Sequence, residues 1–238
     1  MKILILGGSG VLGQAIRNRL TELLIVHIAP SHEELDVTSD NIYISSTYDA
    51  ILYLAGRKDQ EYIESHGQEA MWPNIFGLIN VVSNMHENQK LVYISTGYVY
   101  KYDKSYHKET DGLYPCYRYA WSNLGGECVV KMLPEEHHLI IRCEFSKKPW
   151  HRETAYNNQF TSREEVTTTA KKIVNLISKK AYGTYNVGGK RHSIWEYANS
   201  ISDKEIEEVQ LYHDENPLLP RDTSLNTDKY TTFMKEHK

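Results

Sequence analysis

An apolar strand that leads directly into a glycine-rich turn and a helix opens this chain. Residues 2–6 (KILIL) are short, apolar and without alternation, which indicates a parallel strand buried on both faces. Three glycines follow at intervals of three, and apolar residues at helical spacing continue from residue 11 to residue 23. Such a turn directs backbone N–H groups, at the positive end of the helix, towards a pyrophosphate. We predict a dinucleotide-binding site here, against the alternative of an ordinary turn between a strand and a helix.

The glycines have different roles in such a turn. Gly7 makes the tight turn, Gly10 lets the backbone approach the phosphates, and Gly13 lets the helix pack closely on the strand. We therefore expect the pyrophosphate to contact these glycines and the backbone of Val11 and Leu12.

Strand and helix patterns alternate through the first part of the chain. Strands are predicted over residues 23–28, 49–54, 90–95 and 138–142, and helices over residues 69–86 and 118–133. Pro73 should break the first of these two helices near its start. The order predicts a Rossmann-type α/β fold, a doubly wound parallel sheet with ligands across its carboxyl edge.

The pattern loosens after residue 142. Residues 145–160 have no clear period and are predicted to form a loop that lines a pocket. Helices over 164–177, 193–201 (with Ser193 as N-cap) and 227–237, and strands over 183–187 and 205–211, are expected to follow. We predict a dinucleotide-binding core at residues 1–142. Residues 143–238 should form a small C-terminal substrate-binding lobe, with segments that return to the core.

The composition excludes several kinds of partner. A net charge of −4 and a pI near 6.3 indicate no surface for nucleic acid. The three cysteines have no metal-ligand spacing, so no metal site is predicted and a reducing, cytoplasmic compartment is expected. No apolar stretch reaches the roughly 18–20 residues that span a bilayer, so no membrane association is expected.

Hydroxyl groups cluster where the strand over residues 90–95 ends. Thr96 follows this strand, Tyr119 begins the next predicted helix, and Asn123 lies one turn later on the same helix face. A hydroxyl and a phenol placed in this way can both reach a substrate carbonyl beside a nicotinamide, where the phenol supplies a proton as hydride arrives. Other tyrosines lie close by, so the spacing alone leaves the choice of phenol open.

At this point the chain resembles the extended short-chain dehydrogenases/reductases, and within them the dTDP-4-dehydrorhamnose reductase-like, sugar-nucleotide-binding proteins. The resemblance runs through nearly the whole chain. Its main segments are GGSGVLG (7–13), ELDVT (34–38), LAG (54–56), ISTGYVY (94–100), NLGGE (123–127), QFTSREEV (159–166), YNVGG (185–189) and PRDTSLNT (220–227).

The resemblance implies NAD(P)H-dependent reduction of a nucleotide-diphosphate 4-keto-6-deoxy sugar, as in dTDP-rhamnose biosynthesis. Thr96 would orient the carbonyl and Tyr119 would be the proton donor. The cofactor would also contact Asp36, Leu54, Ala55, Gly56, Asn74, Tyr119 and Asn123, and the substrate Thr96, Gly97, Tyr98, Trp150 and Arg221. In many relatives the helices corresponding to 69–86 and 118–133 pair across a two-fold axis, so a homodimer is expected.

The chain departs from the family at residue 123, where Asn stands in place of the lysine of the Tyr-x-x-x-Lys pattern. That lysine holds the nicotinamide ribose and adds a positive charge near the phenol. Two unit charges about 4 Å apart interact by roughly 4 kcal/mol at a surface-like effective dielectric. Asn123 can replace the hydrogen bond but not the charge, so we expect a reductase with weakened turnover. The alternatives are a catalytically impaired sugar-nucleotide or NAD(P)-binding regulatory protein, and a nucleotide-sugar epimerase.

The choice between NAD and NADP depends on the turn after the second strand. NAD-specific sites usually place a carboxylate there for the ribose 2′-hydroxyl. Here Ser31 and His32 occupy the turn and the first acid is Glu33, which modestly favours NADP. Further along, Trp150 suits a flat base and Arg221 a diphosphate.

Overall fold

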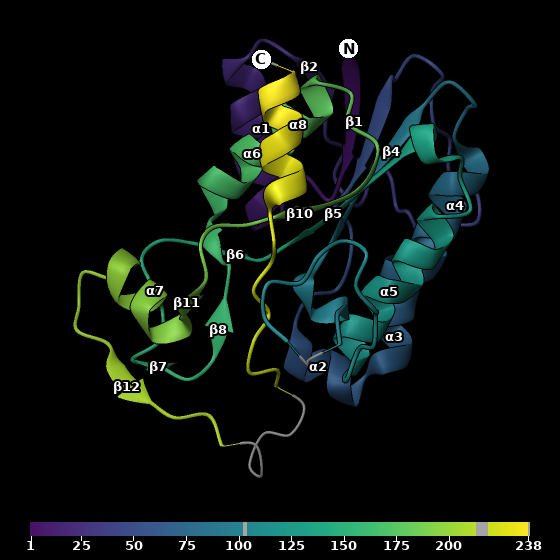
Figure 1. Ribbon diagram of the computed structural model, residues 1–238. Helices are drawn as coiled ribbons and strands as arrows, with labels where there is room; N and C mark the ends of the chain where they lie inside the picture. Colours follow the sequence, from purple (N-terminus) through teal and green to yellow (C-terminus); the bar gives the residue numbers. More distant parts are fainter. Residues whose placement is uncertain (102–103, 213–218, 238) are drawn as a thin grey trace.

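A six-stranded parallel sheet forms the centre of the protein. The computed structural model describes residues 1–101, 104–212 and 219–237 (Figure 1). The strands follow the order β10-β5-β4-β3-β1-β2, and each neighbouring pair is parallel. They are β1 (Lys2–Leu6), β2 (Val26–Ile28), β3 (Ala50–Tyr53), β4 (Lys90–Ser95), β5 (His138–Cys143) and β10 (Gly183–Val187). The predicted Rossmann-type doubly wound sheet is confirmed.

Helices cover both faces of the sheet. On one face lie α1 (Val11–Glu22), α6 (Val166–Ser178) and α8 (Asp228–Glu236), and on the other α4 (Gly77–Asn84) and α5 (Arg118–Val130) (Figure 1). Alternate side chains of β1 enter separate cores, Ile3 and Ile5 towards α1 and α6, Leu4 and Leu6 towards α4 and α5. No helix in the described part of the chain is both long and apolar enough to cross a membrane.

A smaller body lies beside the carboxyl edge of the sheet. It contains α7 (Ile194–Ile201) and the short strand pairs β7 (Thr154–Tyr156) with β12 (Glu207–Val209), and β8 (Phe160–Thr161) with β11 (His192–Ser193). Another pair, β6 (Phe145–Ser146) with β9 (Glu164–Glu165), joins it to the core. Its own small core is built around Ala155, Ile194, Ala198 and Ile206. The predicted loop over 145–160 therefore contains short strands, because its backbone groups pair with segments distant in sequence.

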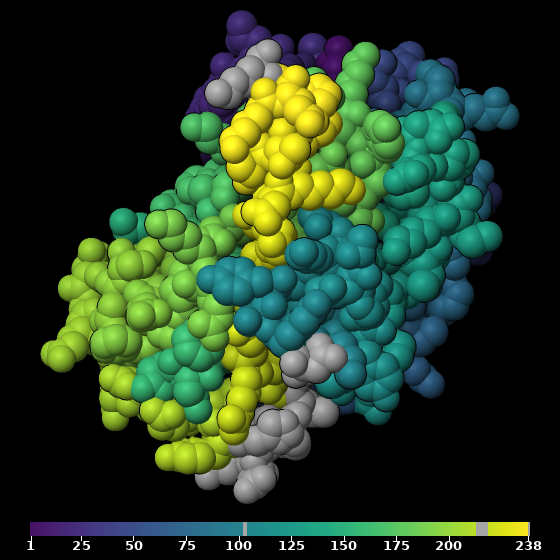
Figure 2. All heavy atoms as spheres, in the orientation of Figure 1, coloured from purple at the N-terminus to yellow at the C-terminus, as the bar shows by residue number. Residues whose placement is uncertain are grey.

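The C-terminal part of the chain belongs to both bodies. β10 extends the central sheet beyond β5, and α6 packs against α1. Residues 219–227 pass between the smaller body and the core before α8 (Figure 2). The domain boundary at residue 142 stays a prediction, but α6, β10 and α8 are segments that return to the core.

Two predicted elements have other bounds, and one short helix was missed. β2 begins at Val26 rather than at residue 23, because Leu24 takes a left-handed conformation (φ 56°) and the Ile25 N–H bonds to Leu20 O, which closes α1. The helix predicted over 69–86 runs from Gly67 to Asn84 and is interrupted at Pro73 as expected, by a π-helical turn (Trp72–Phe76) between α3 (Gly67–Met71) and α4. α2 (Gln60–Ser65), capped by Asp59, was not predicted, because it is too short to show a clear period.

A buried ion pair connects three of these elements. Glu127 of α5 and Arg142 of β5 are 0% and 1% exposed, with 2.6 Å between Oε2 and Nη2. Glu127 also accepts a hydrogen bond from the Ser95 hydroxyl at the end of β4, and Arg142 donates one to the Tyr100 hydroxyl. The pair therefore fixes α5 against the ends of β4 and β5.

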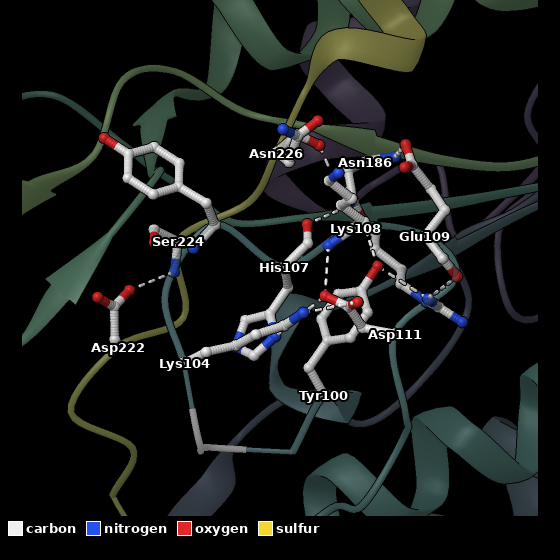
Figure 3. A network of polar contacts seen from close by, with 12 residues as sticks. Tyr100, Lys104, His107, Lys108, Glu109, Asp111, Asn186, Asp222, Ser224 and Asn226 are labelled. Atoms are coloured by element: carbon white, nitrogen blue, oxygen red, sulfur yellow. Dashed lines mark hydrogen bonds and ion pairs between the residues drawn. The ribbon is translucent and has the colours of Figure 1, made fainter.

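The network continues from Tyr100 into the C-terminal half (Figure 3). The Tyr100 hydroxyl donates to Asn186 of β10, and the Asn186 amide donates to His107 O. Backbone hydrogen bonds join His107 to Ser224 and Asn226. The segment after β4 is thereby held between β10 and residues 219–227.

We expect Glu127→Ala to lower the free energy of unfolding by about 3–5 kcal/mol, because it leaves a buried guanidinium without its counter-charge. Urea denaturation would measure the loss. Glu22→Ala is the matched control, since Glu22 pairs with Arg19 at the surface and its removal should cost less than about 1 kcal/mol. Equal losses in the two variants would contradict the structural role of the buried pair.

Candidate active site

The glycine turn after β1 lies against the loop after β3. Gly7 has a φ of +85°, a conformation that favours glycine, and a Cβ there would stand 2.6 Å from the Ala55 backbone nitrogen. The two loops lie where the chain moves from β1 to β2 on one side and to β3 on the other. In open α/β sheets this switch point is where ligands bind.

The start of α1 is open towards this point. Gly10 is the N-cap, without a side-chain capping bond, and the first turn contains no acidic residue. A Cβ on Gly10 would meet only Gly7 O, at 3.5 Å, whereas one on Gly13 would meet Gly7 O at 2.7 Å. Gly13 is therefore required by packing, while Gly10 leaves the N–H groups of Val11 and Leu12 accessible to an anion.

Asn74 fastens the loop after β3 to the helix that bears Tyr119. Its buried amide accepts a hydrogen bond from Arg57 N (2.8 Å) and donates to Arg57 O (3.2 Å) and to Ser122 Oγ (2.9 Å). Ser122 in turn donates to Tyr119 O. Asn74 thus positions residues 54–57 against α5.

Thr96 and Tyr119 meet at the end of β4. Thr96 is buried, and its hydroxyl is near enough to the Tyr119 phenol to lower the pKa of that phenol. Burial raises the pKa of the Tyr119 phenol well above its usual value, and nearby Tyr98 raises it further. The phenol therefore keeps its proton at neutral pH, as a proton donor must before the reaction.

Asn123 lies one turn after Tyr119 and uses its amide within the helix. Its Nδ2 donates to Tyr119 O at 2.8 Å. Asn123 also lines a small cavity together with Leu54, Ala55, Gly56 and Asn74. The structure thus brings five predicted cofactor residues together.

The turn after β2 holds the remaining predicted cofactor residues. Asp36 accepts hydrogen bonds from the Thr38 N–H and hydroxyl, which lower the pKa of its carboxyl group, and it lies 3.7 Å from His32 Nδ1. The Ser31 hydroxyl accepts a hydrogen bond from the Glu34 backbone N–H, and the Glu34 carboxylate accepts one from the Ser31 backbone N–H. Ser31 and His32 are both exposed.

A cleft of about 760 Å³ lies between the loop after β3, the segment after β4 and the smaller body. Its size suits a ligand of small-molecule dimensions. Among its lining residues are Lys58, Tyr98, Tyr117, Trp150, Arg152, Tyr156 and Arg163. Of the predicted substrate residues, Tyr98 and Trp150 line this cleft. Gly97 lies beside Glu144, and Arg221 is exposed and is not among the lining residues.

The sequence reasoning missed several polar residues here. Glu144 is buried, accepts a hydrogen bond from the Thr161 hydroxyl and pairs with Arg163 at 3.7 Å. Burial raises the pKa of Glu144, and Arg163 opposes this effect. Thr161 and Arg163 belong to the QFTSREEV segment, a signal that could have found them, whereas no motif points to Lys58.

The described residues contain no cluster of His, Cys, Asp or Glu suited to a metal ion.

A hydroxyl–phenol pair beside a nucleotide-binding switch point is the arrangement of the extended short-chain dehydrogenases/reductases, and this chain is one of them. The family model described as RmlD substrate binding domain matches residues 1–146. The chain therefore belongs to that family.

Solved structures share the fold. A hypothetical dTDP-4-dehydrorhamnose reductase from Sulfolobus tokodaii is 25% identical, with a TM-score of 0.82 over 98% of this chain and 94% of that one. A dTDP-4-dehydrorhamnose reductase from Bacillus anthracis, in complex with NADP, is 20% identical, with a TM-score of 0.81 over 99% and 98%. A UDP-glucose 4-epimerase from Thermus thermophilus, in complex with NAD, shares the fold at 16% identity, with a TM-score of 0.79 over 100% and 94%. No curated protein sequence matches.

We expect Asn74→Ala to lower the free energy of unfolding by about 1–3 kcal/mol, because the buried Asn74 amide loses three hydrogen bonds to Arg57 and Ser122. Hydrogen exchange at the Arg57 N–H should accelerate more than exchange in β4. Asn84→Ala is the control, since its exposed amide bonds only to Asn80 O within α4 and its loss should cost within about 0.5 kcal/mol. Unchanged protection at Arg57 would refute the fastening role of Asn74.

Proposed function

We propose that the protein reduces the keto group of a nucleotide-diphosphate 4-keto-6-deoxy sugar with NAD(P)H. The observation that supports this most directly is the proximity of the buried Thr96 hydroxyl to the Tyr119 phenol, one helical turn before Asn123, which lines a cavity with Leu54, Gly56 and Asn74. Membership of the RmlD substrate binding domain family adds the class of substrate.

The site suits a dinucleotide on three grounds. Gly10 leaves the start of α1 open, α1 has no acidic residue in its first turn, and the loop after β3 closes on Gly7. The Arg17 side chain lies beside Gly8, with its Cδ 3.3 Å from the position of a Gly8 Cβ, next to Ala29 at the end of β2. A cation there attracts a ribose 2′-phosphate, which supports NADP over NAD together with Ser31 and His32.

Tyr119 and Thr96 divide the work at the sugar. When bound, the reduced nicotinamide supplies a hydride to the carbonyl carbon. Thr96 orients the carbonyl oxygen through a hydrogen bond, and Tyr119 gives its phenolic proton to the same oxygen. Because burial holds the pKa of Tyr119 high, the phenol is a proton donor rather than a base, which favours reduction over oxidation.

The large cleft suits the nucleotide-diphosphate part of the substrate. Arg152 and Arg163 are cations for phosphates, while Trp150 and Tyr156 are flat surfaces for a base. Glu144 offsets part of the Arg163 charge, so Arg152 is the stronger candidate for the diphosphate.

One observation favours a second candidate function, binding without turnover. Asn123 occupies the position of the family's lysine and its amide is already bonded to Tyr119 O. A protein that keeps the pocket but lacks the charge would bind the same ligands and act as a regulatory subunit.

Gly10→Ala tests the cofactor site. We expect the affinity for the dinucleotide to fall by at least about tenfold, or about 1.4 kcal/mol, because a methyl group enters the space of the pyrophosphate. Stability should stay within about 0.5 kcal/mol, since Gly10 has a φ of −67° and space for a Cβ. Calorimetric titration with NADPH and NADP⁺ measures the affinity, with Gly112→Ala as control because nothing lies within 4 Å of its Cβ position. Absence of dinucleotide binding in the folded wild type would refute the proposed function.

Tyr119→Phe tests the reaction. With dTDP-linked 4-keto-6-deoxy sugars the wild type should oxidise NADPH, which lowers its absorbance. The kcat of the variant should be about 10²–10⁴-fold lower, because the proton donor is missing. Its Kd for NADPH should be unchanged. Tyr114→Phe, an exposed tyrosine of the preceding segment, is the control and should keep full activity. Dinucleotide binding with no turnover on any nucleotide-linked keto sugar would favour the binding-only function.

A further inference from the structure

The proposed reaction requires a positive charge near Tyr119. Loss of the phenolic proton leaves a phenolate, and the family's lysine stabilises that negative charge. Asn123 is neutral, and its amide is occupied within α5. If the protein is a reductase, another cation should stand near the same cavity.

Most neighbouring cations are committed elsewhere. Arg163 pairs with Glu144, Arg57 lies over the Tyr62 ring at 4.5 Å, and Arg118 bonds to the Glu64 backbone. Each therefore already has a partner of its own.

Lys58 differs from these residues in its position. It lies in the loop between β3 and α2 and lines both the small cavity with Asn123 and the large cleft with Tyr98. Its ammonium nitrogen is 6.0 Å from the centre of the Phe145 ring, just after the end of β5. The side chain therefore extends from the loop after β3 towards β6, just after the end of β5.

The Lys58 ammonium has no competing partner in the described ranges of the chain. Within residues 1–101, 104–212 and 219–237, no carboxylate or carbonyl is hydrogen-bonded to it. Much of the residue is exposed, yet burial of the ammonium end lowers the pKa of Lys58.

Cys143 connects Lys58 with Tyr119. Burial raises the pKa of the Cys143 thiol to about 12, and the nearby Lys58 ammonium opposes this rise. Cys143 also acts on Tyr119, whose pKa it raises after the larger effects of burial and Tyr98. The thiol at the end of β5 is thus within electrostatic range of both groups.

We propose that Lys58 supplies the positive charge that Asn123 lacks, from the loop after β3, beside the nicotinamide end of the bound cofactor. The proposal rests on the proposed reductase function. In the reaction the Tyr119 O–H bond breaks, the carbonyl oxygen gains the proton, and the Lys58 ammonium stabilises the phenolate that remains. The electron pair comes with the hydride of the reduced nicotinamide, so atoms and charges balance, and water in the open cleft restores the proton of Tyr119.

The test uses the charge of the nicotinamide ring, which is positive in NADP⁺ and neutral in NADPH. An ammonium beside the ring weakens the binding of NADP⁺ only. Lys58→Met should therefore lower the Kd for NADP⁺, relative to the Kd for NADPH, by about three- to tenfold. Lys58→Arg should leave the ratio of the two Kd values unchanged. Lys58→Met combined with Asn123→Lys should restore the ratio, because the charge returns from the other side of the cavity. Calorimetric titration of the full chain measures both Kd values, with Lys131→Met, an exposed lysine after α5, as control.

Turnover provides the second measurement. Lys58→Met should lower kcat about 10- to 100-fold at unchanged KM for NADPH, and the double variant should recover most of it. An unchanged Kd ratio in Lys58→Met, with both dinucleotides bound by the wild type, would overturn the role of Lys58 and leave the reductase function standing. Equal weakening of both dinucleotides would overturn it as well, because Lys58 would then bind a phosphate. If the wild type binds neither dinucleotide, the reductase function and the role of Lys58 fail together.

Discussion

The position of Thr96 and Tyr119, the proposed catalytic pair, depends on a carboxylate and a guanidinium that meet inside the protein. Glu127 lies on the same helix as Tyr119, and the Ser95 hydroxyl that bonds to it directly precedes Thr96. Arg142 completes the contact from β5 with two hydrogen bonds to the Glu127 carboxylate. Burying two charges is expensive, and the cost is offset only when their geometry and additional hydrogen bonds are good. A displacement of α5 along β4 would break these bonds, so the ion pair fixes one register of helix and strand, and with it the separation of Thr96 and Tyr119.

The same guanidinium extends this constraint to the substrate side. Through the Tyr100 hydroxyl it reaches Asn186 of β10, and Asn186 holds the His107 backbone (Figure 3). The segment from residue 97 onwards is therefore tied to the core and to the C-terminal residues that pass beside the smaller body. One connected polar network thus supports the reacting groups and one wall of the cleft, which explains why large polar side chains are buried where apolar ones would be cheaper.

Sequence reasoning found the parts of the protein that have a local cause. β4 has the predicted bounds because an apolar run of strand length follows Lys90. α7 starts after Ser193 because the Ser193 hydroxyl accepts a hydrogen bond from Glu196 N. The start of β2 could not be predicted, because it depends on the left-handed residue Leu24 rather than on a hydrophobic pattern. Glu144 and Lys58 were missed for a related reason. Their significance comes from neighbours far away in sequence, Arg163 for the carboxylate and the end of β5 for the ammonium.

The location of the proposed positive charge on a loop, instead of on the helix that bears Tyr119, has a physical consequence. A lysine one turn after Tyr119 would be fixed to the phenol by the backbone of α5, whatever is bound. Lys58 instead belongs to the loop that closes on Gly7 and that Asn74 fastens through Arg57, next to it in the chain. Its charge is therefore coupled to the geometry of the cofactor loop. A ligand that contacts residues 54–57 would therefore also lie close to the Lys58 ammonium, so in the proposed reaction the dinucleotide and the charge that acts on Tyr119 share one loop.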